Sequence, residues 1–171
     1  MLRPSGILGR IGTLRVDIMR YRALLDQTKS IRGYLLRSTK GLSEEQLLCI
    51  PDGFKNNILW NIGHSITDNC SMLYPPTGKA LPLPDSYFQW FAPETSPADW
   101  KEVPDSAEVL QAGRDVLEKL VDDCAADRME EYEPLELGDG AVLNNIAQAI
   151  AHCNIHEAIH LGVIMSLRKF V

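Results

Sequence analysis

Apolar residues recur at helical spacing over four long stretches of the chain. From Thr13 to about Thr39 they form one stripe, made of Leu14, Ile18, Tyr21, Leu25, Ile31 and Leu35. Similar stripes run from about Lys55 to Leu73, from Ser106 to about Cys124, and from near Asn144 almost to Val171. Recurrence every three or four residues is typical of an amphipathic helix that packs against other helices. We therefore expect four long helices and, because no segment shows convincing strand alternation, an all-α protein.

The segments between these stripes predict how the helices are connected. Ser43 followed by Gln46 resembles a capping box that opens a short helix, and Pro51-Asp52-Gly53 then forms a turn. Residues 74–104 hold seven of the ten prolines, so they form no continuous helix. This segment can pack on the rest of the protein through its aromatic side chains, Tyr87, Phe88, Trp90, Phe91 and Trp100. The economical architecture is a four-helix bundle with this proline-rich crossover between helices two and three, which could then run parallel.

The size and charge of the chain narrow the classes of protein to which it can belong. Its 171 residues have the size of one ordinary domain, and we expect a single domain over residues 1–171 with a bundle core from about residue 14 onward. Its 17 basic and 23 acidic side chains give a net charge of -6. A negative chain has no general attraction for nucleic acid or anionic lipid, so we expect neither as a partner.

The cysteines and the apolar runs bear on the cellular compartment. Cys49, Cys70, Cys124 and Cys153 are widely spaced and form no C-x-x-C pair, which is typical of buried free thiols in a reducing compartment. No apolar run has the length of a signal-peptide core or the ~20 residues of a membrane span. We therefore expect a cytoplasmic protein.

The most specific motif is HEAIHLG, from His156 to Gly162. H-E-x-x-H on a helix places two imidazoles one turn apart, so both can bind one metal ion. Helical spacing puts His156 and His160 on one inward-facing stripe, with His152 at its edge. Two neutral imidazoles inside a core need partners, and either a metal ion or other side chains and water would supply them. We favour the metal ion.

A third ligand decides which kind of metal site this is. Zinc proteases with H-E-x-x-H take it from a downstream glutamate or histidine, but the residues after His160 contain no His, Asp or Glu, which disfavours a protease. The remaining histidine is His64, on a polar stripe of the second helix with Asn57, Asn61, Asp68 and Ser71. That stripe is either a solvated face or the lining of a cleft. Trp60, one turn before His64, favours the cleft because a large indole is seldom left on a wet face.

Together these motifs resemble those of a known family. W-x-x-G-H, here Trp60 to His64 within NNILWNIGH, is followed about ninety residues later by H-E-x-x-H-x-G, here His156 to Gly162. With the Pro-Asp-Gly turn and the proline-rich crossover, they are similar to the DinB-like family of metal-dependent enzymes. The resemblance implies a four-helix bundle, often homodimeric, that binds a divalent ion through His64, His156 and His160. It implies no DNA binding, and related members use thiol cofactors, as in bacillithiol-dependent S-transferases and mycothiol-dependent maleylpyruvate isomerases.

Three imidazoles leave at least one coordination position open, as in catalytic zinc sites. We therefore expect an enzyme, either a transferase or a hydrolase, that acts on a small molecule through zinc, nickel or iron. The transferase could use a low-molecular-weight thiol as a cofactor. Candidate orienting groups are Asn57, Asn61 and Asp68, with His152 at the edge of the site. The alternatives are a non-catalytic metal-binding scaffold or stress-response protein, in which Cys153 could add a fourth ligand, and a bundle without metal.

Glu157 is the candidate general base by analogy with zinc proteases. It lies ~100° around the helix from His156 and away from the inward stripe. A surface or interhelical salt bridge is therefore the role that we favour for it.

Overall fold

The computed structural model describes the backbone of residues 7–171 and the side chains of residues 21–171. The long helices are α1 (Ile7–Arg37), α3 (Ile58–Leu73), α5 (Ser106–Ala125) and α6 (Ile146–Leu167). The short helices are α2 (Glu44–Leu48) and α4 (Asp85–Phe91), with single 3-10 turns at Pro75–Thr77 and Pro97–Asp99. Two strands, β1 (Leu135–Glu136) and β2 (Val142–Leu143), complete the described elements.

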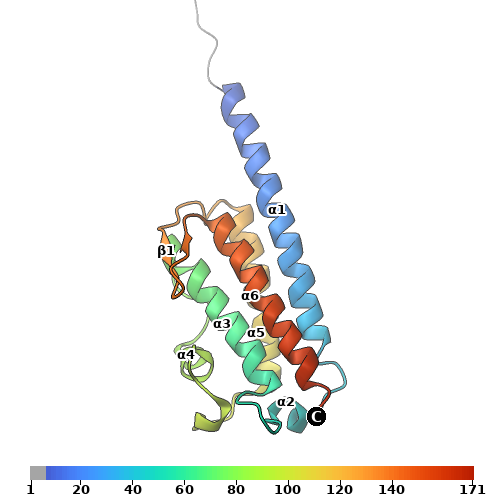
Figure 1. Ribbon diagram of the computed structural model, residues 1–171. Helices are drawn as coiled ribbons and strands as arrows, with labels where there is room; N and C mark the ends of the chain where they lie inside the picture. The colour runs from blue at the N-terminus through green and yellow to red at the C-terminus, as the bar shows by residue number, and fades with distance from the viewer. Residues whose placement is uncertain (1–6) are drawn as a thin grey trace, which may run out of the picture.

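The four long helices form a bundle in which α6 packs against α1 and α3, and α5 packs against the same two helices. Figure 1 shows that α3 and α5 run in the same direction, opposite to α1 and α6. The chain can only connect two parallel neighbours through a long return segment, and residues 74–104 provide it. The predicted all-α bundle with a crossover between its second and third long helices is therefore confirmed. None of the described helices combines the length and apolar character that crossing a bilayer requires.

Side-chain caps set where the helices begin. The Asn57 Oδ1 accepts a hydrogen bond from the Trp60 backbone N–H at 2.7 Å, so α3 begins at Ile58 and not at about Lys55 as predicted. Asp105 and Asn145 cap α5 and α6 in the same way. Such caps satisfy N–H groups that have no partner within the helix. The capping box predicted at Ser43 is present and opens α2.

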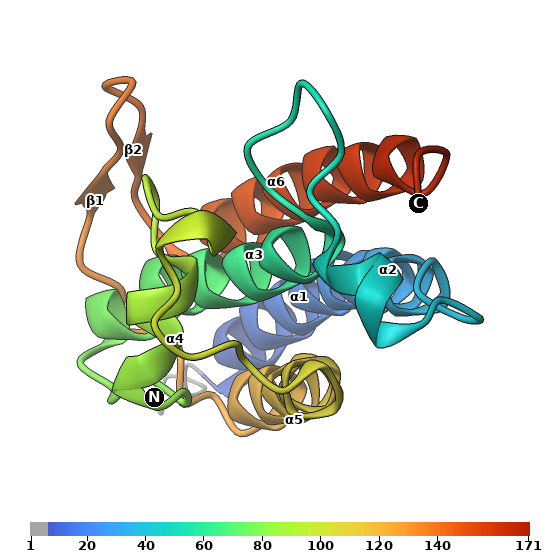
Figure 2. The same ribbon diagram turned by 90° about the horizontal axis from the view of Figure 1, so that it is seen from below.

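The proline-rich crossover is folded onto α3, as Figure 2 shows for α4. Phe91, at the end of α4, is fully buried and lies directly over Gly63. A Cβ atom added at Gly63 would lie 2.5 Å from the Phe91 ring, so only glycine allows this approach. The Trp100 indole N–H donates to the Trp90 carbonyl at 3.0 Å and ties the end of the crossover to α4.

Three expectations about local structure were wrong. An antiparallel hairpin pairs β1 with β2, although no strand was predicted, because strands of two residues are too short to show alternation. On α1, Ile31 is only half-buried, while Thr28 and Arg32 take the inward positions. Cys49 is exposed, whereas Cys70, Cys124 and Cys153 are buried free thiols as expected. The predicted inward side chains of Leu14 and Ile18 lie outside the described residues.

Candidate metal centre

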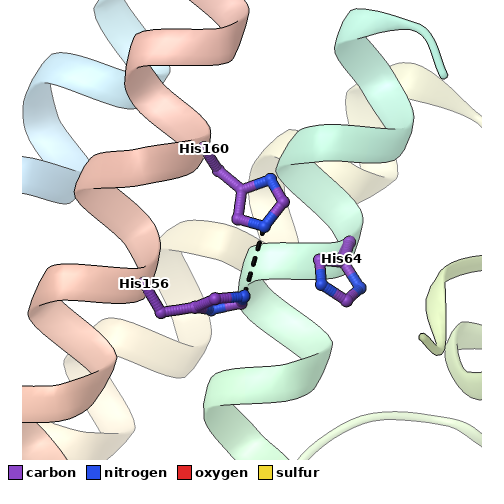
Figure 3. Close-up of side chains that lie close together, drawn as sticks. All are labelled: His64, His156 and His160. Carbon is purple, nitrogen blue, oxygen red and sulfur yellow. Dashed lines mark hydrogen bonds between the residues drawn. The ribbon is translucent and has the colours of Figure 1, made fainter.

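Three histidines from two distant segments meet between α3 and α6 (Figure 3). His64 of α3 is buried, and His156 and His160 of α6 are half-buried. One nitrogen of each ring lies within 4.8 Å of a nitrogen of each of the other two. The polar stripe that leads into α3 is thus no solvated face, because its first three members, Asn57, Asn61 and His64, are buried.

The crossover fixes the ring of His64. Its Nδ1 lies 2.8 Å from the Phe91 carbonyl oxygen, and because a carbonyl can only accept, Nδ1 carries the proton. The Trp60 indole stacks on a face of the same ring, with 4.5 Å between centroids and an angle of 6°, and its N–H donates to Thr95 Oγ1 at 2.9 Å. W-x-x-G-H therefore encodes a stacking partner, a glycine that admits Phe91, and the histidine that Phe91 orients.

The ring of His160 is fixed by Asn61. The His160 Nδ1 lies 2.9 Å from Asn61 Oδ1, while the amide nitrogen of Asn61 donates to the Asn57 carbonyl at 2.8 Å. The two ends of an asparagine amide look alike, and their assignment follows from their partners. Because the Asn57 carbonyl has no proton to give, the amide nitrogen must face it and the oxygen must face His160. The Nδ1 of His160 therefore donates.

The ring of His156 is fixed in the same manner by Asn69. The His156 Nδ1 lies 3.3 Å from Asn69 Oδ1, and the Asn69 amide nitrogen donates to Glu157 Oε2 at 3.2 Å. Glu157 is paired with Arg32 and is acceptor-only as a carboxylate, so it fixes which end of the Asn69 amide faces His156. The Nδ1 of His156 therefore donates as well.

All three Nε2 atoms are consequently left as lone-pair donors that can bind a metal ion. Those of His156 and His160 are 3.2 Å apart, close to the ~3.4 Å that separates two nitrogens bound to one tetrahedral zinc ion. Burial, with smaller effects from His156 and His64, lowers the pKa of His160 to about 3. Burial also lowers the pKa of His156. The rings of His156 and His160 are therefore neutral near pH 7, and the donor set of three imidazole nitrogens fits a divalent cation.

Glu157 forms an interhelical ion pair inside the bundle, one of the two roles favoured from the sequence. Its side chain is fully buried, and the Arg32 guanidinium of α1 donates to both carboxylate oxygens, with Nη2 to Oε2 at 3.0 Å. Arg32 also donates from Nη1 to the Gly113 carbonyl of α5 at 2.6 Å. Burial lowers the pKa of Arg32, but Glu157 outweighs it and the pKa lies above its usual value. Arg32 and Asn69 thus occupy both oxygens of the candidate general base.

The other residues singled out in the sequence lie around the cluster in different roles. Both ends of the Asn57 side chain bind backbone groups, with its amide nitrogen donating to the Leu48 carbonyl at 3.0 Å. Asp68 is half-buried, with one oxygen 3.6 Å from His156 Nε2. His152 is half-buried, and a positive charge on it disfavours protonation of His156. In the part of the chain that the structure describes, the cluster contains the three histidines and not Cys153. The Cys153 thiol contacts the Asn69 carbonyl instead, at 3.9 Å.

Three residues that build the site were not predicted from the sequence: Arg32, Asn69 and Phe91. Arg32 carried a usable signal, because a charge three residues before buried Leu35 lies on the apolar stripe of α1. Asn69 has no motif of its own, and it lies five residues after His64 on α3. Phe91 acts through its backbone carbonyl, which leaves no trace in a side-chain pattern.

The comparison with known protein families agrees with this arrangement. A family model of the DinB superfamily matches residues 27–164, which include the three histidines, the crossover, all of α3 and α5, most of α6 and the C-terminal part of α1. No curated protein matches the chain.

Proposed function

The chain belongs to the DinB superfamily, and from this premise we propose that it is a divalent-metal-dependent enzyme that acts on a small molecule as a transferase or a hydrolase. One observation carries the proposal. Each of the three histidine rings has its Nδ1 committed to an oxygen acceptor, so three Nε2 lone pairs are left for one common ion. Buried polar groups left without a partner are costly, and a bound cation removes that cost.

The ligands in this proposal are His64, His156 and His160. Imidazole nitrogens suit zinc, nickel and iron, and the donor set does not separate them. A divalent ion bound there would supply Lewis acidity, which polarises substrate oxygen and lowers the pKa of water or of a thiol. A low-molecular-weight thiol is therefore the co-substrate that we propose for the transferase version.

Two further side chains complete the proposed site. Asp68 lies beside His156 at the half-exposed side of the cluster, where its carboxylate can accept a proton or orient a substrate N–H or O–H group. The stacked indole of Trp60 covers one face of the buried His64 ring and helps to keep water from it. Asn61 acts on His160 and not on the substrate, because both ends of its amide are already bound.

The alternative function is a metal-binding scaffold or stress-response protein without catalysis. A structural site of this kind requires protein side chains at all coordination positions of the ion. Among the described residues, Cys153 does not belong to the cluster of three histidines, so it is not the fourth ligand. The two functions differ in whether ligands exchange at the ion. Manganese-loaded protein will enhance water proton relaxation if a position is open, and cobalt-loaded protein will develop a thiolate absorption band when a small thiol is added. A loaded protein with neither response would contradict the enzyme proposal and favour the scaffold.

We also propose that the protein is a cytoplasmic homodimer. The outer face of α6 supports the dimer, because Glu157 is the only charged residue of that helix and is fully buried. Ile155 and Ile159 on the same helix are 63% and 60% exposed. A helix without charge on its outer face is typically covered by another surface. The buried free thiols support a reducing compartment.

A further inference from the structure

We propose that Glu157 is a positioning residue for the metal site: through Asn69 it fixes the tautomer of His156 so that its Nε2 lone pair faces the ion. The proposal rests on the metal binding proposed above and assigns a task to the glutamate of H-E-x-x-H that differs from the general base considered from the sequence. Glu157 acts on the proposed ligand His156 through one intervening side chain, Asn69, and not on the substrate.

The carboxylate of Glu157 is held by groups from two other helices, and a third helix holds one of those groups. Arg32 of α1 donates to both of its oxygens, and Asn69 of α3 donates to Oε2 at 3.2 Å. Arg32 is anchored in turn to the Gly113 carbonyl of α5. Both charged side chains are buried, so neither has water available as a substitute partner. The position of Glu157 and its pairing with Arg32 are therefore set by the packing of the helices.

An ionised carboxylate determines how the neighbouring amide must turn. It offers only acceptors, so the Asn69 amide nitrogen faces Glu157 and the amide oxygen faces His156 Nδ1 at 3.3 Å. The proton of His156 then sits on Nδ1. If the amide turned over, its nitrogen would face His156, Nδ1 would become the acceptor, and the proton would move to Nε2. That tautomer cannot bind a metal ion through Nε2.

The second ligand of α6 provides an internal comparison. The Asn61 amide is fixed by the Asn57 backbone carbonyl, which no side-chain substitution can convert into a donor. A change at Glu157 should therefore alter the tautomer of His156 and leave that of His160 unchanged. A general disturbance of the bundle would change both.

The nearly isosteric substitution Glu157→Gln tests the proposal most directly. Its amide group gives Asn69 a donor to face, so the Asn69 amide can turn over. Imidazole ¹⁵N chemical shifts of the metal-free protein report which nitrogen of each ring is protonated. We expect Nδ1–H for both His156 and His160 in the wild type. In the variant we expect a shift of His156 toward Nε2–H, with His160 unchanged. Zinc affinity, measured by competition with a chelator, should fall roughly tenfold to a hundredfold.

A second variant guards against misfolding of the first. Asn69→Ala removes the bridge but leaves the pair of Arg32 and Glu157 intact, and it should weaken zinc binding to a similar extent. In Glu157→Gln/Asn69→Ala the two losses should not add, because both changes interrupt one path. Additive losses, or a His156 tautomer that stays unchanged in folded Glu157→Gln, would overturn the proposal. Wild-type protein that binds no zinc but shows the expected tautomers would contradict the proposed function alone.

Discussion

The Nε2 atoms of His156 and His160 lie 3.2 Å apart although the Nδ1 atom of each ring donates to an asparagine. Two lone pairs at this distance repel each other unless a proton or a cation lies between them. The lowered pKa values of both rings disfavour a proton at neutral pH. A bound metal ion would remove this repulsion, and the residues that orient the rings can be tested for their part in binding it.

Asn61→Ala should weaken zinc binding roughly tenfold to a hundredfold, because the His160 ring loses the acceptor that fixes its Nδ1 proton. Chelator competition measures the affinity. The matched control is Asn154→Ala, which removes another buried asparagine of the bundle, bonded to Thr28 and to the Leu24 carbonyl. The control should lose stability and keep its zinc affinity. Equal affinities in the two variants would show that Asn61 has no orienting role.

Gly63→Ala should lower the stability of the fold by about 1 to 3 kcal/mol, because the new methyl group displaces the buried ring of Phe91. Zinc affinity should fall at the same time, since the Phe91 carbonyl that orients His64 moves with the ring. Urea unfolding and chelator competition measure the two effects. Gly162→Ala is the control because nothing lies within 4 Å of an added Cβ there. An unchanged zinc affinity in Gly63→Ala would show that the position of Phe91 does not affect the metal site.

The helices and the cluster of three histidines could be predicted from the sequence because both depend on periodic spacing. His64, His156 and His160 lie where two helical stripes face each other, and W-x-x-G-H and H-E-x-x-H mark them. The residues that orient the three histidine rings could not be predicted in the same way. Asn69 and Phe91 act through contacts between segments far apart in the chain, and such contacts leave no spacing in the sequence.

Asp123→Asn should destabilise the protein near pH 7 by about 1 to 2 kcal/mol. Burial alone raises the pKa of Asp123, but hydrogen bonds from Lys119 and Arg128 outweigh it and lower the pKa below its ordinary value. A lowered folded-state pKa means that the ionised carboxylate stabilises the fold above the ordinary value of 3.8, and that this contribution is lost as the pH falls through the folded-state pKa. Denaturant unfolding from pH 7 down to pH 2.5 measures it.

The difference in unfolding free energy between wild type and Asp123→Asn should therefore shrink below about pH 4. Asp122→Asn is the control, since Asp122 is exposed on the same helix. It removes the same formal charge from the chain. If the difference in unfolding free energy between wild type and Asp123→Asn stayed constant down to pH 2.5, the ionised form of Asp123 would contribute nothing to stability.

Ile155→Glu and Ile159→Glu should convert the proposed dimer into a monomer, because each places a charge on the uncharged outer face of α6. Sedimentation equilibrium gives the mass in solution. Val103→Glu is the control, because Val103 is an equally exposed apolar residue on the crossover. A wild-type protein of monomer mass would contradict the dimer, as would an unchanged dimer in both α6 variants.

Two charged residues show why a sequence can place a side chain without revealing its partner. Arg32 lies at an inward position of α1, and Glu157 is the only charge on α6, so each is unusual for its helix. Their pairing depends on the register between α1 and α6, which no local pattern encodes. The β1–β2 hairpin was missed for a related reason, since its four paired residues gain their structure from each other.

Elemental analysis of native protein purified without a histidine tag, beside His64→Ala prepared in the same way, tests the metal centre most directly. His64 is the histidine of the cluster that comes from α3, and we expect that its loss leaves a pair on α6 that cannot hold the ion alone. We predict one divalent ion per wild-type chain and background metal in the variant, with the helical circular dichroism of both intact. A wild-type protein without stoichiometric metal after incubation with zinc, or a variant that keeps its ion, would contradict the account.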